Sequence, residues 1–373
     1  MTPKSSRYNG QNATAKQHNI LTPTARTGLV ERTMDHPIPH IDIGALFGAP
    51  SRERDLTDQS IMAAAAASGF FVARGFPPDV PAGHAARAAL LRLFQLPDHE
   101  TRKLWRQKFD PSHPNVYRGW FPLQTGFLTA KEGIDMGPDV VHGTSVVRHG
   151  DPLRELTPLP SPGVLPGWRE AVAAYYRGME KVSQALMRAI ARGLTLEEHF
   201  FDSAFDRGLS TLRLLRYPVR TDADRTAQSD PSVWVTHQGK RFYVNGAPHV
   251  DSGFLTLLAQ DGVPGLQARH RDGTWLDVPP TDDGLAVNFG KVLERWCGGR
   301  IKATEHRVIG IGGERMSIPF FYEARADAEI RPLPMDGASS FEPFLYGDYL
   351  WATTTQFIEF KGMESLRPAA RPH

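Results

Sequence analysis

The stretch that decides the fold is HVDSGFLTLL, residues 249–258. It places His249 and Asp251 two residues apart, so on a strand their side chains point to the same face. A second histidine, His306, follows in the strand-like segment TEHRV, residues 304–308. Two imidazoles and one carboxylate on one side of a metal leave the opposite side open, which suits Fe(II) that must bind dioxygen and an organic co-substrate together. We therefore predict that His249, Asp251 and His306 bind iron.

A receptor for an acid follows the second histidine. Arg315 and Ser317 lie two residues apart in RMSIPFF, residues 315–321, so on a strand they too share a face. An arginine fork beside a hydroxyl is suited to binding a carboxylate. The sequence thus predicts an iron site with a place for an organic acid next to it.

The chain around these motifs is organised as strands and turns. Strand-like segments are found at 212–217, 254–258, 266–270, 274–278, 285–289, 304–309 and 316–322. Asp272-Gly273 is typical of a tight hairpin turn. Many short strands without intervening helices predict a closed or two-sheet antiparallel barrel over residues 208–325. We expect residues 220–246, which are polar, to form a long loop that enters the His249 strand.

Helices are predicted on both sides of this core. Residues 37–205 combine short strands with helices at 57–67, 81–96 and 97–105, and with a long amphipathic helix whose apolar residues recur from Trp168 to Ile190. A capping box at residues 195–198 predicts a further short helix. Residues 341–362 are expected to form a C-terminal helix, followed by a tail at 363–373.

Composition excludes several classes of protein. The 373 residues include 43 basic and 41 acidic side chains with no basic stripe, which argues against nucleic-acid binding. No stretch approaches the roughly 20 apolar residues that span a membrane. Cys297 is the single cysteine, which favours a reducing, cytoplasmic location and a structural role for this thiol. We expect residues 1–36 to be a disordered extension, with Met34 as a candidate start.

Four motifs in order resemble one known family. Segments 249–258, 265–280, 288–308 and 315–321 are similar to successive motifs of the isopenicillin N synthase-like branch of the Fe(II)/2-oxoglutarate-dependent dioxygenases. The resemblance covers residues 37–362 and implies a single domain, mainly β, with a double-stranded β-helix (jelly-roll) core flanked by helices. It also implies His249, Asp251 and His306 as iron ligands.

The resemblance implies roles for three further residues. Arg315 would pair with the distal carboxylate of 2-oxoglutarate, Ser317 would hydrogen-bond the same group, and Tyr217 would lie near the co-substrate or substrate acid. Many plant members have asparagine two residues before that tyrosine, where this chain has Leu215. The sequence LLRYP at residues 214–218 is more similar to that of isopenicillin N synthase, which uses no 2-oxoglutarate.

Three functions follow as hypotheses. The first is an oxygenase that uses Fe(II), O2 and 2-oxoglutarate, with ascorbate as a candidate reductant. It would hydroxylate, desaturate or cyclise a small molecule of secondary metabolism and release succinate and CO2. The second is an Fe(II) oxidase of the same fold in which Arg315 holds the substrate itself. The third is a non-catalytic binding barrel, which the intact ligand triad argues against.

Overall fold

The computed structural model describes residues 38–123, 129–146, 150–220, 231–335, 337–338, 340–357 and 359–367. The expected N-terminal extension and most of the C-terminal tail lie outside these residues. Within them, no helix has the length and apolar character needed to cross a membrane.

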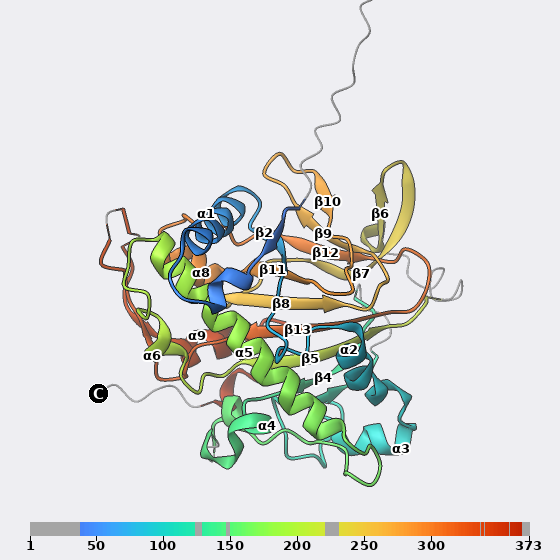
Figure 1. Ribbon diagram of the computed structural model, residues 1–373. Coiled ribbons are helices and arrows are strands. Elements are labelled where there is room, and N and C mark those ends of the chain that lie inside the picture. The colour runs from blue at the N-terminus through green and yellow to red at the C-terminus, as the bar shows by residue number, and fades with distance from the viewer. Residues whose placement is uncertain are drawn as a thin grey trace, which may run out of the picture. The chain divides into compact units, whose positions relative to one another are not determined.

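Two sheets form the centre of the domain (Figure 1). The larger has eight strands in the order β1 (His40–Asp42), β2 (Phe70–Arg74), β11 (Leu285–Phe289), β8 (Leu255–Gln260), β13 (Arg315–Tyr322), β5 (Thr211–Tyr217), β4 (Glu132–Met136) and β3 (Gly119–Phe121). The smaller has the order β10 (Trp275–Asp277), β9 (Leu266–Arg269), β12 (His306–Ile309), β7 (Lys240–His249) and β6 (Trp234–His237). A separate pair consists of β14 (Glu329–Ile330) and β15 (Phe344–Leu345). Pairing is antiparallel except between β1 and β2.

Helices pack around the two sheets (Figure 1). They are α1 (Arg52–Ala67), α2 (His84–Leu91), α3 (Asp98–Thr101), α4 (Asp139–His142), α5 (Trp168–Gly193), α6 (Asp202–Phe205), α8 (Lys291–Trp296) and α9 (Tyr346–Thr354). Short 3-10 turns lie at Gly44–Phe47, Arg92–Gln95, Arg102–Leu104, Gly143–Val146, Pro152–Arg154, Pro231–Val233 and Glu364–Leu366.

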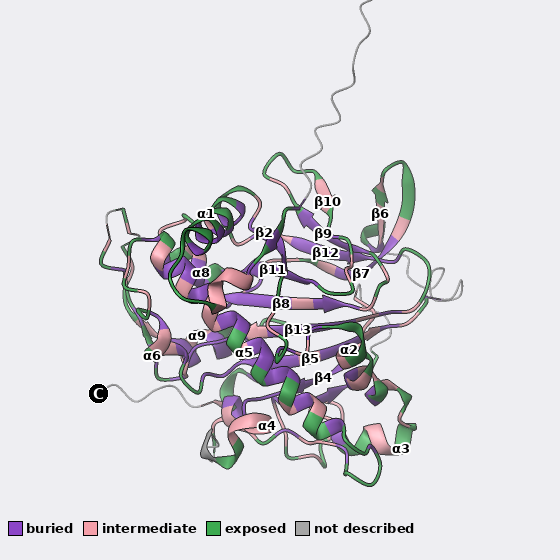
Figure 2. Cartoon of the chain, viewed as in Figure 1, coloured by how far each residue is buried: buried purple, intermediate pink, exposed green. Residues whose placement is uncertain are grey.

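Helix α5 is the long amphipathic helix that the sequence predicts. It crosses the larger sheet diagonally, and its buried stripe contrasts with its exposed side (Figure 2). The Tyr176 ring meets Phe320 of β13 edge to face at 4.9 Å, an arrangement that aromatic pairs favour. Tyr176 Oη donates to the Ser210 carbonyl at 2.6 Å, so its buried hydroxyl is satisfied. The helix thus closes the outer face of the sheet and leaves the inner face for a site.

Three local expectations are wrong. Residues 231–246 contain the hairpin β6–β7 rather than loop, because Gln238 and Gly239 adopt φ of 48° and 73° and form a two-residue turn. The predicted helix 97–105 is reduced to α3 and a 3-10 turn. No helix starts at the capping box, because Thr195 has a φ of 60° and its hydroxyl donates to the Leu194 carbonyl, so it caps nothing.

Candidate metal centre

The two histidines meet because their strands pair. His249 ends β7 and His306 begins β12, and they face each other in the antiparallel register of the smaller sheet. Their ring centroids are 4.3 Å apart. Asp251 follows β7 directly, and its Oδ1 lies 3.7 Å from the Nε2 atom of each histidine. One ligand atom from each of these three residues lies within 4.8 Å of the others, and this is the one such group in the part of the chain that the structure describes.

Backbone carbonyls orient both imidazoles. His249 Nδ1 lies 2.8 Å from the Ala247 carbonyl, and His306 Nδ1 lies 3.1 Å from the Thr304 carbonyl. A carbonyl can only accept, so each Nδ1 carries the proton and each Nε2 presents its lone pair to the centre. Enclosure in the cavity and repulsion from His306 lower the pKa of His249 to about 4, so the ring is neutral at pH 7. Neutral imidazole is the form that binds metals.

Asp251 is held by its other oxygen. Thr256 Oγ1 donates to Asp251 Oδ2 at 2.6 Å, and Asn288 Nδ2 donates to the same atom at 2.7 Å. Burial by itself would raise the pKa of Asp251, but the two imidazoles and these two hydrogen bonds hold it below its usual value. Oδ1 is thereby left facing the histidines, and the three donor atoms fit a divalent metal with an open side.

We expect Asn288→Ala to weaken Fe(II) binding by about 10- to 100-fold, because hydrogen-bond partners of a metal ligand typically contribute that much. Anaerobic Fe(II) titration measures the change. Asn245→Ala is the matched control, since Asn245 is also buried and comes from β7 but does not line the cavity. Equal losses in both variants would show that Asn288 acts only through general packing.

Arg315 is a buried cation with unused donors. Its side chain is 1% exposed, and Nη2 donates to Gln260 Oε1 at 3.1 Å. Nε and Nη1 have no hydrogen-bond partner among the described residues, and burial lowers the pKa of the guanidinium. A buried charge without a partner is costly, so this pair of donors fits an anionic ligand.

The neighbours of Arg315 complete an acid receptor. Tyr217 stands opposite it in the β5–β13 register, and the guanidinium carbon lies 5.2 Å from the Tyr217 ring centre. Ser317 is buried on the same strand face, opposite Leu215. The leucine therefore occupies the position next to the hydroxyl, and it offers no hydrogen bond to an acid there.

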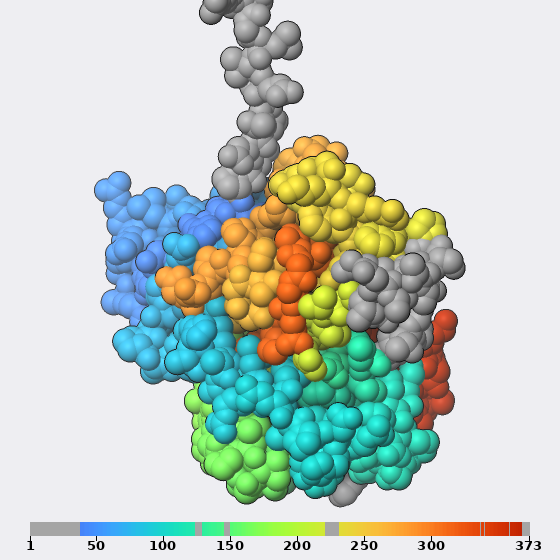
Figure 3. Space-filling model, turned by 90° about the vertical axis from the view of Figure 1, so that its right-hand side faces the viewer, coloured from blue at the N-terminus to red at the C-terminus, as the bar shows by residue number. Residues whose placement is uncertain are grey.

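One cavity of about 410 Å³ joins the two parts of the site. Its walls include the three candidate metal ligands together with Arg315, Ser317 and Tyr217, so the structure brings together all six residues that the sequence singled out. A cavity of this size suits small molecules. In the space-filling view, the β6–β7 hairpin (yellow) lies beside the orange segment near residue 310, which its Tyr243 carbonyl contacts (Figure 3).

Sequence reasoning overlooked several polar residues of the cavity wall. Glu323 and Arg213 both line the cavity. Strand alternation could have identified them, because Glu323 continues the face of Arg315 and Ser317, and Arg213 continues the face of Tyr217. Burial raises the pKa of Glu323 to about 8, and Tyr346 donates a hydrogen bond to it. Lys131 and Glu359 also line the wall, from segments without a strand pattern.

Cys297 and two further polar residues lie away from the centre. Cys297 is buried, and burial raises its pKa to about 12, as expected of a structural thiol. His237 contacts Asp277 at 3.1 Å, and its side chain takes no part in the metal centre. Arg118 is fully buried and donates to Thr211 Oγ1 and to the Leu209 carbonyl, so it does not reach the cavity.

Known proteins are similar in sequence to this chain. The profile of the 2OG-Fe(II) oxygenase superfamily matches residues 211–324. Isopenicillin N synthase of Streptomyces clavuligerus is 30% identical over 320 residues, covering 84% of this chain and 93% of that protein. Isopenicillin N synthase of Penicillium chrysogenum is 28% identical over 331 residues, covering 87% and 97%.

Solved structures agree on the fold. A full-length Neurospora crassa protein in complex with alpha-KG and thymine has a TM-score of 0.69 at 24% identity, covering 86% of this chain and 97% of that one. The dioxygenase for auxin oxidation of rice has a TM-score of 0.62 at 24% identity, covering 89% and 100%. The predicted mainly β fold with a jelly-roll core is thereby confirmed. Sequence identity across nearly the whole of a known relative, together with the matching profile, shows that this chain is a non-haem Fe(II)/2-oxoglutarate dioxygenase and belongs to the isopenicillin N synthase-like branch of the 2OG-Fe(II) oxygenase superfamily.

Proposed function

We propose that this enzyme oxidises a small organic molecule, with His249, Asp251 and His306 as iron ligands and with Arg315 and Ser317 binding the distal carboxylate of 2-oxoglutarate. The observation that carries the proposal is the buried guanidinium of Arg315. Its Nε and Nη1 have no partner in the described part of the chain, and it shares one cavity with the candidate metal ligands. A dicarboxylate would satisfy those donors at one end and reach toward the metal with the other.

Each part of the site has a distinct task. When bound, Fe(II) with 2-oxoglutarate and O2 supplies the oxidising power, and succinate and CO2 leave. His249, Asp251 and His306 would hold Fe(II), and a set of three protein ligands would leave positions for co-substrate and oxygen. Arg315 and Ser317 fix the orientation of the acid. Leu258, Leu266 and Val308 give the cavity an apolar wall that limits water.

An anaerobic optical titration tests this assignment. Fe(II) followed by 2-oxoglutarate should produce a broad visible charge-transfer band. Arg315→Ala should weaken 2-oxoglutarate binding by about 10- to 100-fold, because a hydrogen bond to a charged group contributes about 1.5–3 kcal/mol. Arg216→Ala is the matched control: Arg216 comes from the same strand pair but binds Glu132 and Glu314 outside the cavity, and its loss should leave the band unchanged.

The same titration decides the second candidate function. Two observations favour an isopenicillin N synthase-type oxidase, in which Arg315 would hold the substrate: the 30% identity to that enzyme and the leucine at position 215. Iron binding without a charge-transfer band would select this oxidase. Failure to bind iron at all would leave a non-catalytic binding barrel.

The substrate is a small metabolite in this proposal. The cavity volume supports it, as does the thymine bound in the Neurospora crassa structure. Mass analysis of the product separates hydroxylation, which adds an oxygen atom, from desaturation and cyclisation, which each remove two hydrogen atoms and are told apart by NMR spectroscopy. A chain with one buried cysteine fits the reducing cytoplasm, where we place the enzyme.

A further inference from the structure

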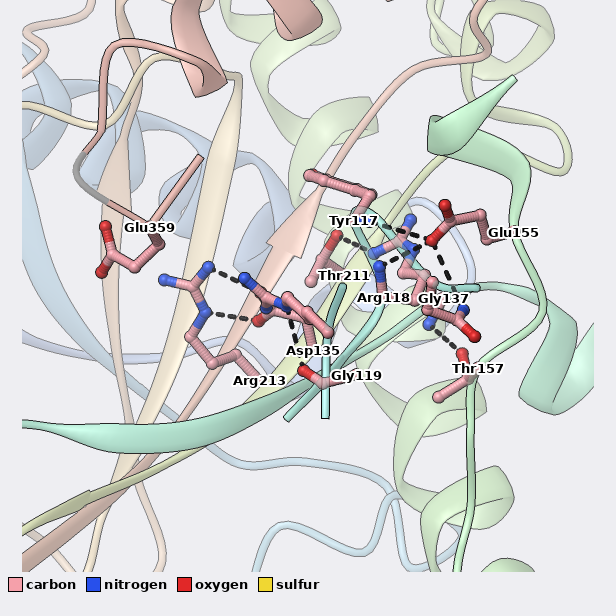
Figure 4. A network of polar contacts seen from close by, with 12 residues as sticks. Tyr117, Arg118, Gly119, Asp135, Gly137, Glu155, Thr157, Thr211, Arg213 and Glu359 are labelled. Atoms are coloured by element: carbon pink, nitrogen blue, oxygen red, sulfur yellow. Dashed lines mark hydrogen bonds and ion pairs between the residues drawn. The ribbon is translucent and has the colours of Figure 1, made fainter. Parts of the chain in front are cut away.

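A second charged cluster lines the cavity and has no task in binding iron or 2-oxoglutarate. It consists of Lys131, just before β4, Arg213 in β5 and Glu359, which follows α9. Lys131 Nζ lies 3.1 Å from Glu359 Oε1. Figure 4 shows the Glu359 carboxylate on the side of the Arg213 guanidinium that faces away from Asp135. Three chain segments thus bring two cations and one anion to the same wall.

The guanidinium of Arg213 is fixed along one edge. Its Nε and Nη2 both donate to Asp135, Nη2 at 2.9 Å, and the Phe121 and Phe321 rings lie 5.4 Å from its central carbon. The remaining terminal nitrogen points away from Asp135 (Figure 4). A guanidinium held by a carboxylate on one edge and by rings on its sides is pre-organised to donate from the other edge.

The cluster, counted together with Asp135 and Arg106 beside it, carries an excess of positive charge. Asp135 is shared by Arg213 and by Arg106, which is fully buried and whose Nη1 has no partner among the described residues. Three cations, Lys131, Arg106 and Arg213, therefore face two anions, Asp135 and Glu359. Although burial opposes ionisation, Lys131 and Arg213 hold the pKa of Glu359 down to about 2. An anion that binds at this wall of the cavity is therefore stabilised by a positive electrostatic potential.

This wall is separate from the receptor at Arg315. Arg213 lies four residues before Tyr217 on β5, and Tyr217 stands opposite Arg315. At the rise of an extended strand this separates the backbones of the two arginines by roughly 13 Å. A five-carbon diacid with one end on Arg315 and the other directed to the candidate metal centre is engaged at both ends and does not use Arg213. The cavity therefore has one cationic group for the co-substrate and another that a different molecule must use.

We propose that Lys131 and Arg213 bind a carboxylate of the substrate, and that Glu359 occupies these cations until the substrate displaces it. The inference rests on the proposed function, since it names the substrate class of the same cavity. The enzyme would select small organic acids, because a neutral analogue leaves the excess charge uncompensated.

Matched probes test the charge preference directly. We would titrate 2-naphthoate and its neutral counterpart 2-naphthamide by calorimetry into anaerobic protein saturated with Fe(II) and 2-oxoglutarate, so that Arg315 is already occupied. Wild type should bind the carboxylate at least 10-fold more tightly than the amide. Lys131→Met and Arg213→Met should each weaken naphthoate binding by 10-fold or more and leave naphthamide binding unchanged. Arg213→Lys should recover part of the loss.

Glu359→Gln distinguishes substrate binding by the cluster from a purely structural role of the cluster. If Glu359 competes for the two cations, its neutralisation should tighten naphthoate binding several-fold; if the cluster only holds the fold together, the same change should weaken or not affect it. Should Arg213→Met fail to fold, Lys131→Met decides, because it leaves the Arg213–Asp135 pair intact. Equal affinity of wild type for the two probes, or a preference that survives Lys131→Met, overturns the proposal.

The charge-transfer band in the same samples keeps the two proposals apart. A normal band with no preference for naphthoate removes the acid-binding wall and retains the oxygenase assignment. A missing band, with a preference for naphthoate that Lys131→Met abolishes, removes 2-oxoglutarate from the assignment and retains the wall.

Discussion

Asp251→Ala should abolish substrate oxidation and reduce Fe(II) affinity by more than about 100-fold, since loss of a direct ligand exceeds the 10- to 100-fold effect of losing one of its hydrogen-bond partners. Asp251 is the one carboxylate of the candidate centre, and its Oδ1 faces both Nε2 atoms. The variant would retain two neutral imidazoles, which hold a divalent cation weakly without a charged partner. Anaerobic Fe(II) titration and 2-oxoglutarate consumption measure the two effects.

The control is Asp272→Ala, which removes a carboxylate from the exposed hairpin turn before β10. It should leave iron binding and turnover as in wild type. If Asp251→Ala kept its full function, the non-catalytic binding barrel would become the better account of the chain. A melting curve close to that of wild type would show that the loss of activity is not a loss of fold.

Asp135→Asn should lower the free energy of unfolding by about 3–5 kcal/mol, the usual cost of removing one partner from a buried charge cluster. Asp135 is 1% exposed and accepts from both Arg106 and Arg213, and both arginines would lose this carboxylate. Urea unfolding at pH 7 measures the change. Asp79→Asn, which breaks the exposed pair with Lys181, is the control and should leave the midpoint unchanged.

The effect of Asp135 should depend on pH. Burial raises its pKa, but the two arginines outweigh this and lower it from 3.8 to about 2. A carboxylate with a lowered pKa stabilises the fold above its unfolded pKa, and this contribution is lost as the pH falls through the folded value. The difference between wild type and Asp135→Asn should therefore be full at pH 5–7 and shrink below pH 4. A difference that stays constant down to pH 2 would contradict the ion-pair explanation.

The sequence allowed the metal centre to be predicted because its signals are local. Arg315 and Ser317 are two positions apart on β13, so strand alternation puts them on one face whatever the rest of the fold does. His249 and Asp251 are also two positions apart, with His249 at the end of β7 and Asp251 just beyond it. The same rule applied further along each strand would have reached Glu323 and Arg213. Helix α5 could be predicted equally well, because its apolar residues recur with the helical period over 26 residues.

Short elements were harder to predict. Four-residue α3 and the hairpin at Gln238-Gly239 depend on a few backbone angles, and the capping box at Thr195 was overridden by a left-handed φ. In such segments local propensity is weak, and packing against the rest of the chain decides the conformation.

By itself, the sequence determined the β-rich class and the candidate residues of the site: His249 with Asp251, Arg315 with Ser317, and the distant His306. Only the tertiary structure decided the pairing of β7 with β12, which brings His249 and His306 together, and the meeting of Lys131, Arg213 and Glu359 from three distant segments. The physical reason is that alternation acts within one strand, whereas register and cavity walls depend on long-range packing, whose contribution is spread over the whole core.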